Sequence, residues 1–258
     1  MSRTVVLEHA KFQRNLSVAK QPWCAIFPLG KISERKAYRK KRLRKKEIKE
    51  KTLRKKEIRP KMKAILFDND GVVVPTIEMF SQRFSREYRI PADEITPFFK
   101  GPFGDCMVGK ADLKVVIKPY LKEWGWKKGV DALLQYWFKS EHLINTELVK
   151  EIHRLRRQGV NCCLATNQEK YRLEYMLKEM GFKDIFDEVF CSAQLGFKKP
   201  SMEFFDGVYA GLARGLTLKK EDVFYFDDEQ KNVAAGNAFG FRSYLYRDIA
   251  HFKATIKL

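Results

Sequence analysis

The stretch that decides the fold is Lys63 to Thr76, with the sequence KAILFDNDGVVVPT. Its first part, Ala64 to Phe67, is a short apolar run between polar residues, which is typical of a strand buried on both faces of a parallel sheet. Asp68 and Asp70 follow this run, and Gly71 lets the chain turn sharply behind them. Open α/β sheets hold their sites at the carboxyl ends of the strands, so the sequence predicts that both carboxylates lie at such an edge.

The two carboxylates at this strand end admit two interpretations. They repel each other, and a cation between them would relieve the repulsion, with Mg²⁺ as the natural candidate. One acid could then act as a nucleophile that forms an aspartyl-phosphate, while the other transfers protons. Alternatively, Asp and Asn stand here only to cap the strand, because their side chains hydrogen-bond their own backbone.

The positive charge of the chain is concentrated at its N-terminus. The formal charge of the 258 residues is +19. Residues 1–63 hold 22 Lys and Arg against 5 Asp and Glu, and residues 64–258 hold 29 against 27. With 45% hydrophobic residues the chain can bury the core of one or two domains. The globular part is therefore nearly neutral, and the charge belongs to a separate segment.

Residues 1–61 are predicted to be a basic arm, disordered or partly helical. The hexapeptide LRKKEI occurs at Leu43 to Ile48 and again at Leu53 to Ile58, a spacing that fits no heptad. Its few apolar residues cannot bury a core. Three interpretations stay open: the arm binds nucleic acid or another anionic surface, it is a solvated tail without a specific partner, or it is an over-extended reading frame upstream of a start at Met62.

The cysteines and the hydropathy pattern favour a reduced, cytoplasmic protein. The cysteines are odd in number and form no CxxC pair, which indicates free thiols and not a disulfide framework or a zinc site: Cys24, Cys106, Cys162, Cys163 and Cys191. No apolar stretch is long enough to cross a bilayer, and no signal peptide is visible. We therefore expect a cytoplasmic localisation and no membrane partner.

Strands and helices alternate along the second half of the chain, which predicts an α/β fold with a doubly wound parallel, Rossmann-like sheet. Buried strands are predicted at 160–165, 188–191, 223–226 and 241–246, and helices at 148–158, 169–179, 202–212 and around 232–239. About 75 residues of helical spacing separate the first two strands, too many for a loop. The sequence thus predicts a core of residues 62–75 and 148–258, with a small helical cap domain at 76–147 inserted after the first strand.

Polar side chains follow three of the predicted strands at the same edge of the sheet. Asp68 and Asp70 end the first, Thr166 and Asn167 the second, and Asp227 and Asp228 the fourth, while Lys199 opens a helix from that side. Phosphoryl transfer requires a nucleophile, a metal and fixed donors around the phosphoryl oxygens. This set supplies those groups, whereas strand caps alone would not require it.

These residues carry a resemblance to the haloacid dehalogenase-like (HAD) hydrolase superfamily. Four motifs occur in order: DxDGV as Asp68 to Val72, a strand-end Thr as Thr166, a Lys followed by Pro as Lys199-Pro200, and an acidic pair with an Asn-containing helix as Asp227-Asp228 and Asn232. The resemblance covers Met62 to Leu258, and the insertion point resembles the subclass with a helical cap between motifs one and two.

The resemblance implies a role for each of the matched residues. Asp68 would be the nucleophile, and Asp70 would protonate the leaving group and then activate the water. Thr166, the backbone near Asn167, and Lys199 would hold the phosphoryl oxygens. The ligands of Mg²⁺ would be the carboxylates of Asp68, Asp227 and Asp228, together with the backbone carbonyl of Asp70.

The superfamily contains several reactions, so the resemblance alone leaves the reaction open. Dehalogenases lack the second acid of the DxD motif, so the presence of Asp70 argues against that reaction. Phosphonatases use a cap lysine, for which Lys110, Lys114 and Lys118 are the candidates. The prediction is a Mg²⁺-dependent phosphatase that hydrolyses a small phosphorylated metabolite, a sugar phosphate or a nucleotide, through an aspartyl-phosphate. The alternatives are a sugar phosphomutase or another hydrolase of this type, a nucleic-acid-associated protein that acts through the basic arm, and a non-catalytic binding module.

Overall fold

Five short strands pair in parallel in the order β3-β2-β1-β4-β5. The computed structural model describes residues 40–49 and 62–256. The strands are β1 (Ala64–Phe67), β2 (Asn161–Thr166), β3 (Glu188–Cys191), β4 (Val223–Asp227) and β5 (Arg242–Leu245). In the central strand, Phe67 pairs with Leu164 on one side and Phe226 on the other. The strands predicted from the sequence are confirmed to within one residue at each end.

Helices connect the strands and also fill the insertion after β1. They are α2 (Phe80–Tyr88), α3 (Ala92–Lys100), α4 (Phe103–Cys106), α5 (Leu113–Val116), α6 (Lys118–Glu123), α7 (Gly129–Ser140), α8 (Thr146–Arg157), α9 (Lys170–Lys178), α10 (Phe182–Ile185), α11 (Ser192–Leu195), α12 (Met202–Gly215), α13 (Gln230–Phe239) and α14 (Ile249–Ile256), with a 3-10 turn η1 at Lys220–Asp222. The predicted helices of the second half are confirmed. α14, only about two turns long, was not expected from the sequence.

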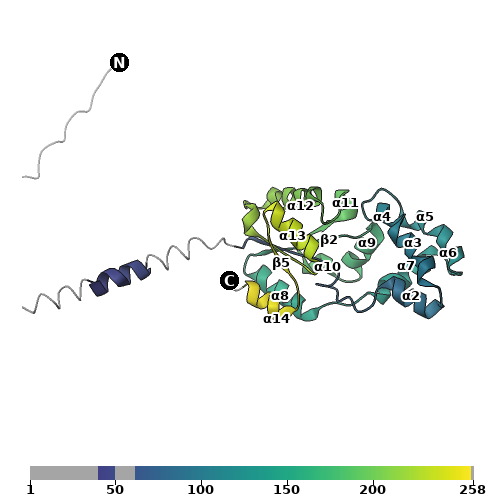
Figure 1. Ribbon diagram of the computed structural model, residues 1–258, viewed down its shortest axis with the longest axis horizontal. Helices are drawn as coiled ribbons and strands as arrows, with labels where there is room; N and C mark the ends of the chain where they lie inside the picture. The colour runs from purple at the N-terminus through teal and green to yellow at the C-terminus, as the bar shows by residue number, and fades with distance from the viewer. Residues whose placement is uncertain (1–39, 50–61, 257–258) are drawn as a thin grey trace, which may run out of the picture. The chain divides into compact units, whose positions relative to one another are not determined.

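Alternate residues of β1 pack against opposite faces of the sheet. Ile65 and Phe67 lie in one hydrophobic cluster with Phe252 of α14, whose ring centroid is 5.6 Å from that of Phe67. Leu66 lies in a second cluster with Phe205 of α12. Figure 1 shows α8 and α14 on one side of the sheet and α12 and α13 on the other. The doubly wound arrangement therefore places both faces of the strand in the core. Burying each such side chain contributes about 1.5–3 kcal/mol to stability.

Side-chain caps determine where three of the helices begin. The Asn145 side chain accepts from the N–H of Leu148 at the start of α8. Ser201 does the same for Phe204 at the start of α12, and Glu169 accepts from two backbone N–H groups in the first turn of α9. Each cap satisfies a donor that the helix itself leaves unpaired.

The insertion between β1 and β2 is helical, from α2 to α7, and lies at one end of this unit (Figure 1). Its interior is aromatic: the Phe80 ring stacks on Trp137 with centroids 4.6 Å apart, and Phe84 meets Trp124 edge-on at 5.7 Å. The same hydrophobic cluster continues into one face of the sheet. The division into a core and a cap at residues 76 and 147 stays a prediction.

Residues 40–49 form a helix in which every residue is exposed. Seven of its ten residues are Lys or Arg, so its surface is strongly cationic. The remainder of the predicted basic arm, residues 1–39 and 50–61, lies outside the described residues. In the part of the chain that the structure describes, no helix is long and apolar enough to cross a membrane.

We expect a chain that starts at Met62 to unfold at the same temperature as the full chain. Among the described residues, both hydrophobic clusters draw only on residues from Met62 onward, and the helix at 40–49 buries nothing. Thermal unfolding of the two chains, followed by circular dichroism at equal concentration, checks this. A melting temperature several degrees lower in the shorter chain would show that residues 1–61 belong to the folded unit.

Candidate active site

The carboxyl ends of β1 and β4 bring Asp68 and Asp227 to opposite sides of one buried ammonium group. Lys199 Nζ lies 2.6 Å from Asp68 Oδ1 and 2.8 Å from Asp227 Oδ2. Lys199 is 3% exposed, Asp68 8% and Asp227 0%. β4 pairs directly with β1, which is why residues far apart in sequence meet at this edge. Three of the residues predicted from the sequence therefore form one cluster.

Asp227 is held by donors on both of its oxygens. In addition to Lys199, its carboxylate accepts from the hydroxyl of Tyr225, the side-chain amide of Asn232 at 3.0 Å and the backbone N–H of Glu229 at 2.8 Å. Such a buried carboxylate is fixed in orientation.

Asp228 has the opposite character, since it is exposed. One carboxylate oxygen from each of Asp68, Asp227 and Asp228 lies within 4.8 Å of the other two. Gly71 makes room for this approach: a Cβ atom at residue 71 would lie 2.0 Å from Asp228 Oδ2, and the φ angle of Gly71 is +75°. Three converging carboxylates are the ligand set that a hard divalent cation prefers, so these residues fit Mg²⁺.

The charges of this cluster shift the pKa values of its members in different directions. Burial raises the pKa of the Asp68 carboxyl well above its usual range, against the lowering effect of Lys199. Burial also acts to raise the pKa of Asp227, but Lys199 and the surrounding donors outweigh it and the net shift is downward. Burial opposes the charge of Lys199, yet the two carboxylates raise its pKa, so it stays an ammonium.

Asp70 lies beside this cluster but in a more open position. More than a third of its surface is exposed. Asn69 Nδ2 donates to Asp70 Oδ1 at 2.8 Å, and Gln168 Nε2 donates to Asp70 Oδ2 at 2.7 Å. Nearby protein atoms displace water and raise the pKa of Asp70, while Arg172 and Lys199 lower it in part. The two acids of the DxD sequence thus have different surroundings.

Thr166 ends β2 next to β1, Asn167 follows it, and the two residues have different roles in the structure. Thr166 Oγ1 is buried and has no hydrogen-bond partner among the residues that the structure describes. A buried hydroxyl without a partner is costly, so a ligand oxygen at this position would satisfy it. The Asn167 side chain instead accepts from the Lys199 N–H at 2.8 Å and donates to the Lys199 carbonyl at 3.1 Å. Its amide therefore positions the Lys199 loop.

The structure adds side chains that sequence reasoning missed. Tyr225 contacts Asp227 from two positions earlier on β4, where alternation places both on one face, so the strand pattern could have revealed it. Gln168 reaches Asp70 across 98 residues of sequence, and its place two residues beyond Thr166 was the available signal. Arg172 is buried on α9 and donates to the Phe138 carbonyl at 2.9 Å. No local sequence pattern indicated that this arginine would be buried.

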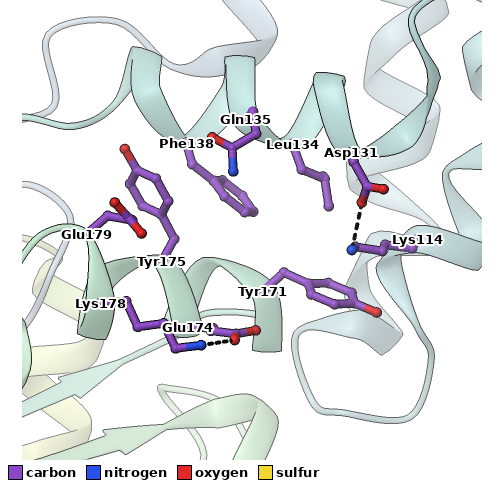
Figure 2. Close-up of a pocket in the computed structure, with 10 residues that line it drawn as sticks. All are labelled: Lys114, Asp131, Leu134, Gln135, Phe138, Tyr171, Glu174, Tyr175, Lys178 and Glu179. Atoms are coloured by element: carbon purple, nitrogen blue, oxygen red, sulfur yellow. Dashed lines mark hydrogen bonds and ion pairs between the residues drawn. The ribbon is translucent and has the colours of Figure 1, made fainter.

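A groove of ≈ 360 Å³ lies between α7 and α9. Figure 2 shows its walls, with Phe138 and Leu134 from α7 facing Tyr171 and Tyr175 from α9. None of the ten described residues that line it is one of the predicted catalytic residues. The groove and the carboxylate cluster therefore share no residue.

The three candidate lysines of the insertion do not fit the role of a Schiff-base amine. Lys110 and Lys118 are exposed. Lys114 pairs with Asp131 at 2.7 Å in the groove (Figure 2), and the hydrogen bond to Asp131 raises its pKa. A lysine that forms a Schiff base is desolvated and has a lowered pKa. The opposite shift in the pKa of Lys114 and the exposed positions of Lys110 and Lys118 therefore give no support to the phosphonatase interpretation.

Comparison with known proteins decides the family. Residues 65–245 match the family described as haloacid dehalogenase-like hydrolase, which spans all four motifs. The chain belongs to this family. As a member of the HAD-like hydrolases it shares the parallel Rossmann-like sheet that the sequence predicted.

Two further similarities concern a curated protein and a solved structure. The HAD-like chain is 32% identical over 96 residues to the sesquiterpene phosphatase astK of Aspergillus oryzae, covering 37% of this chain and 45% of astK. It therefore spans less than half the length of that relative. The HAD family enzyme bt-2542 of Bacteroides thetaiotaomicron superposes with a TM-score of 0.64 at 18% identity, covering 75% of this chain and 98% of bt-2542. That enzyme has also been crystallised with magnesium and inorganic phosphate.

The fold is also shared with an enzyme of different chemistry. The L-2-haloacid dehalogenase of Xanthobacter autotrophicus superposes with a TM-score of 0.52 at 15% identity, covering 76% of this chain and 83% of the dehalogenase. At such identities the likeness shows the fold alone, and the residues at the strand edge must distinguish the reactions.

Substituting Gly71→Ala is expected to lower both activity and stability. The left-handed backbone alone costs about 1–2 kcal/mol, which lowers the melting temperature by roughly 2–8 °C. The added methyl would also displace the Asp228 carboxylate. A misplacement of about 1 Å can reduce turnover about 100-fold. Calorimetry and the rate of phosphate release from an aryl phosphate measure the two effects.

Gly104→Ala is the matched control for this substitution. Gly104 lies in α4, and a Cβ atom there would meet nothing within 4 Å. Alanine is a better helix former than glycine, so the control should keep full activity and an equal or slightly higher melting temperature. Equal behaviour of the two variants would contradict the steric argument.

Proposed function

We propose that this protein is a Mg²⁺-dependent phosphatase that hydrolyses a small phosphorylated metabolite through an aspartyl-phosphate on Asp68. The observation that carries the proposal is the difference between the two acids of one strand end. Asp68 is buried against an ammonium at 2.6 Å, whereas Asp70 is open and held by amide donors. Pairs of carboxylates in different environments take different roles in acid-base catalysis.

Asp68 is the nucleophile in this proposal. The nucleophile is the ionised carboxylate, which the Lys199 ammonium at 2.6 Å favours and burial opposes. An oxygen of Asp68 attacks the phosphorus, and the bond to the leaving oxygen breaks. Lys199 holds positive charge close to the phosphoryl oxygens, and the Thr166 hydroxyl, which lacks a protein partner, donates to one of them. Fixed donors of this kind stabilise the charge of the transition state without reorganisation.

Asp70 transfers the protons. It donates one to the leaving oxygen in the first step. In the second step it takes one from the water that attacks the phosphorus of the aspartyl-phosphate, which releases phosphate and restores Asp68. The open position of Asp70 gives it access to both oxygens.

Asp68, Asp227 and Asp228 would hold Mg²⁺, with the backbone carbonyl of Asp70. When bound, the ion neutralises charge on the phosphoryl oxygens. The convergence of three carboxylates within 4.8 Å supports this assignment. So does the crystallisation of bt-2542, a protein of the same fold, with magnesium and inorganic phosphate.

The proposed substrate is a small phosphorylated metabolite. Sugar phosphates and nucleotides are the general expectation, and the partial similarity to a sesquiterpene phosphatase adds phosphorylated terpenoids to the compounds that should be tested. We propose that helices α2–α7 act as a cap that selects among them. The four described cysteines are buried and unpaired, which supports a reduced, cytoplasmic setting.

Asp70 also argues against the dehalogenase reaction. Displacement of a halide needs a nucleophile but no proton for the leaving group, because halides leave as stable anions. A second carboxylate held by two amide donors has no function in that step. A sugar phosphomutase would use the same residues, and it differs in returning the phosphoryl group to the substrate.

Asp68→Asn is expected to abolish phosphatase activity. Loss of a catalytic nucleophile reduces turnover by roughly 10⁴-fold or more. Phosphate release is measured at neutral pH with Mg²⁺ on an aryl phosphate, sugar phosphates, nucleotides and a sesquiterpenyl phosphate. Asp206→Asn, an exposed change on α12, should behave as wild type. No turnover of any compound by folded wild type would overturn the proposed function, and retained turnover in Asp68→Asn would overturn the nucleophile.

Mg²⁺ is expected to raise the melting temperature, and Asp228→Asn should remove most of the effect. A ligand at 100 times its dissociation constant stabilises the folded state by about 2.7 kcal/mol. Calorimetry of wild type, Asp228→Asn and Asp206→Asn, each with Mg²⁺ or with chelator, measures this without reference to activity. An equal Mg²⁺ effect in Asp228→Asn would contradict the metal ligand assignment.

A further inference from the structure

The side chain of Gln168 completes the hydrogen bonding of Asp70. Gln168 is 9% exposed, and its Nε2 donates to Asp70 Oδ2 at 2.7 Å. The other oxygen, Oδ1, accepts from Asn69 Nδ2 at 2.8 Å. Each oxygen of this carboxylate is therefore met by one amide donor. Asn69 belongs to the same turn as Asp70, whereas Gln168 comes from a separate loop after β2.

The backbone of Gln168 is fixed from a third strand. Its N–H donates to Ser192 Oγ at 3.0 Å, and its carbonyl accepts from the Ala193 N–H at 3.3 Å and lies 3.1 Å from Cys191 Sγ. These partners stand at the end of β3 and the start of α11. Ser192 itself is fully buried. The Gln168 side chain is thus presented from a rigid backbone, as a positioning group requires.

Two donors constrain a carboxylate more than one donor does. Rotation about the last bond of an Asp side chain is soft, so a single hydrogen bond to one oxygen leaves the carboxylate plane free to turn. A second donor on the other oxygen fixes the plane. Proton transfer depends on this orientation, because the donor and acceptor atoms must lie within hydrogen-bond distance and in line.

We propose that Gln168 is a positioning residue that sets the plane of the Asp70 carboxyl for proton transfer to the leaving group. This inference rests on the proposed phosphatase function. In the step concerned, an Asp68 oxygen bonds to phosphorus, the bond from phosphorus to the leaving oxygen breaks, and the proton of Asp70 passes to that oxygen. Gln168 does not touch the substrate and acts through Asp70.

The test uses substrates that differ in their need for a proton. A nitrophenolate leaves readily without protonation, whereas an alkoxide does not. Gln168→Met keeps the length of the side chain but removes the donor. The quantity compared is kcat/KM, which reports the steps up to departure of the leaving group. For the full-length variant we expect a loss of roughly 10–100-fold with an alkyl phosphate and less than about 3-fold with nitrophenyl phosphate.

Two controls separate positioning from a structural effect. Gln194→Ala removes an exposed glutamine from the neighbouring α11 and should leave kcat/KM unchanged with both substrates. In an Asp70→Asn background, Gln168→Met should cause no further loss, because its effect passes through Asp70.

Each outcome bears on one proposal. If wild type turns over neither phosphate, the phosphatase function fails and the role of Gln168 fails with it. If wild type is active but Gln168→Met loses the same factor on both substrates, or loses activity further in the Asp70→Asn background, the positioning role is overturned and the phosphatase function stands. The positioning role is supported if Gln168→Met loses activity with the alkyl phosphate alone and causes no further loss in the Asp70→Asn background.

Discussion

The structure of the site depends on one buried ammonium between two buried carboxylates. Lys199 Nζ contacts Asp68 and Asp227 at 2.6 and 2.8 Å, with little solvent at any of the three groups. Without it, two acids on adjacent strands would face each other in a poorly solvated position, and breaking such a buried pair typically costs about 3–5 kcal/mol. Parallel pairing of β1 with β4 brings the acids together, and Lys199 makes the arrangement tolerable.

The ammonium can do this only because its backbone is held in place. The Asn167 side chain bonds both the N–H and the carbonyl of Lys199, which ties the loop before α12 to the end of β2. Ser201 then caps α12 two residues later. The end of β2 and the start of α12 therefore fix the backbone of Lys199. Its long side chain reaches the two acids from this fixed backbone. The sheet edge, the loop and the helix form one rigid support.

The sequence indicated most of the residues that meet at this strand edge, and it also indicated Asn167 and Asn232, which hold Lys199 and Asp227. It did not indicate Tyr225 and Gln168, which hold Asp227 and Asp70. Asp68, Thr166, Lys199 and Asp227 end buried apolar runs or open a helix, so strand periodicity and motif order located them. Gln168 follows Thr166 by two residues, but its contact with Asp70 depends on which strands are neighbours, and apolar runs do not specify strand order.

The same limit applies to the helices and to the buried cations of the structure. Long amphipathic helices such as α12 have an apolar periodicity that a sequence displays, while α14 is too short to show one and is fixed by the burial of Phe252. Arg172 has a charged side chain in the first turn of α9, which sequence patterns assign to solvent. Tertiary contacts with the carbonyls of Phe138 and Glu141 place it in the interior instead. Contacts of this kind exist only once the insertion and the core have packed together.

The two acids at the end of β4 have different surroundings. Asp227 has its oxygens occupied by Lys199, Tyr225, Asn232 and the Glu229 N–H, so its geometry is fixed but its remaining capacity is small. Asp228 is exposed and lies where the absence of a side chain at residue 71 lets it approach. A hard cation needs ligands that are both well placed and available. In the proposed Mg²⁺ site, Asp227 would provide the fixed position and Asp228 the available oxygens.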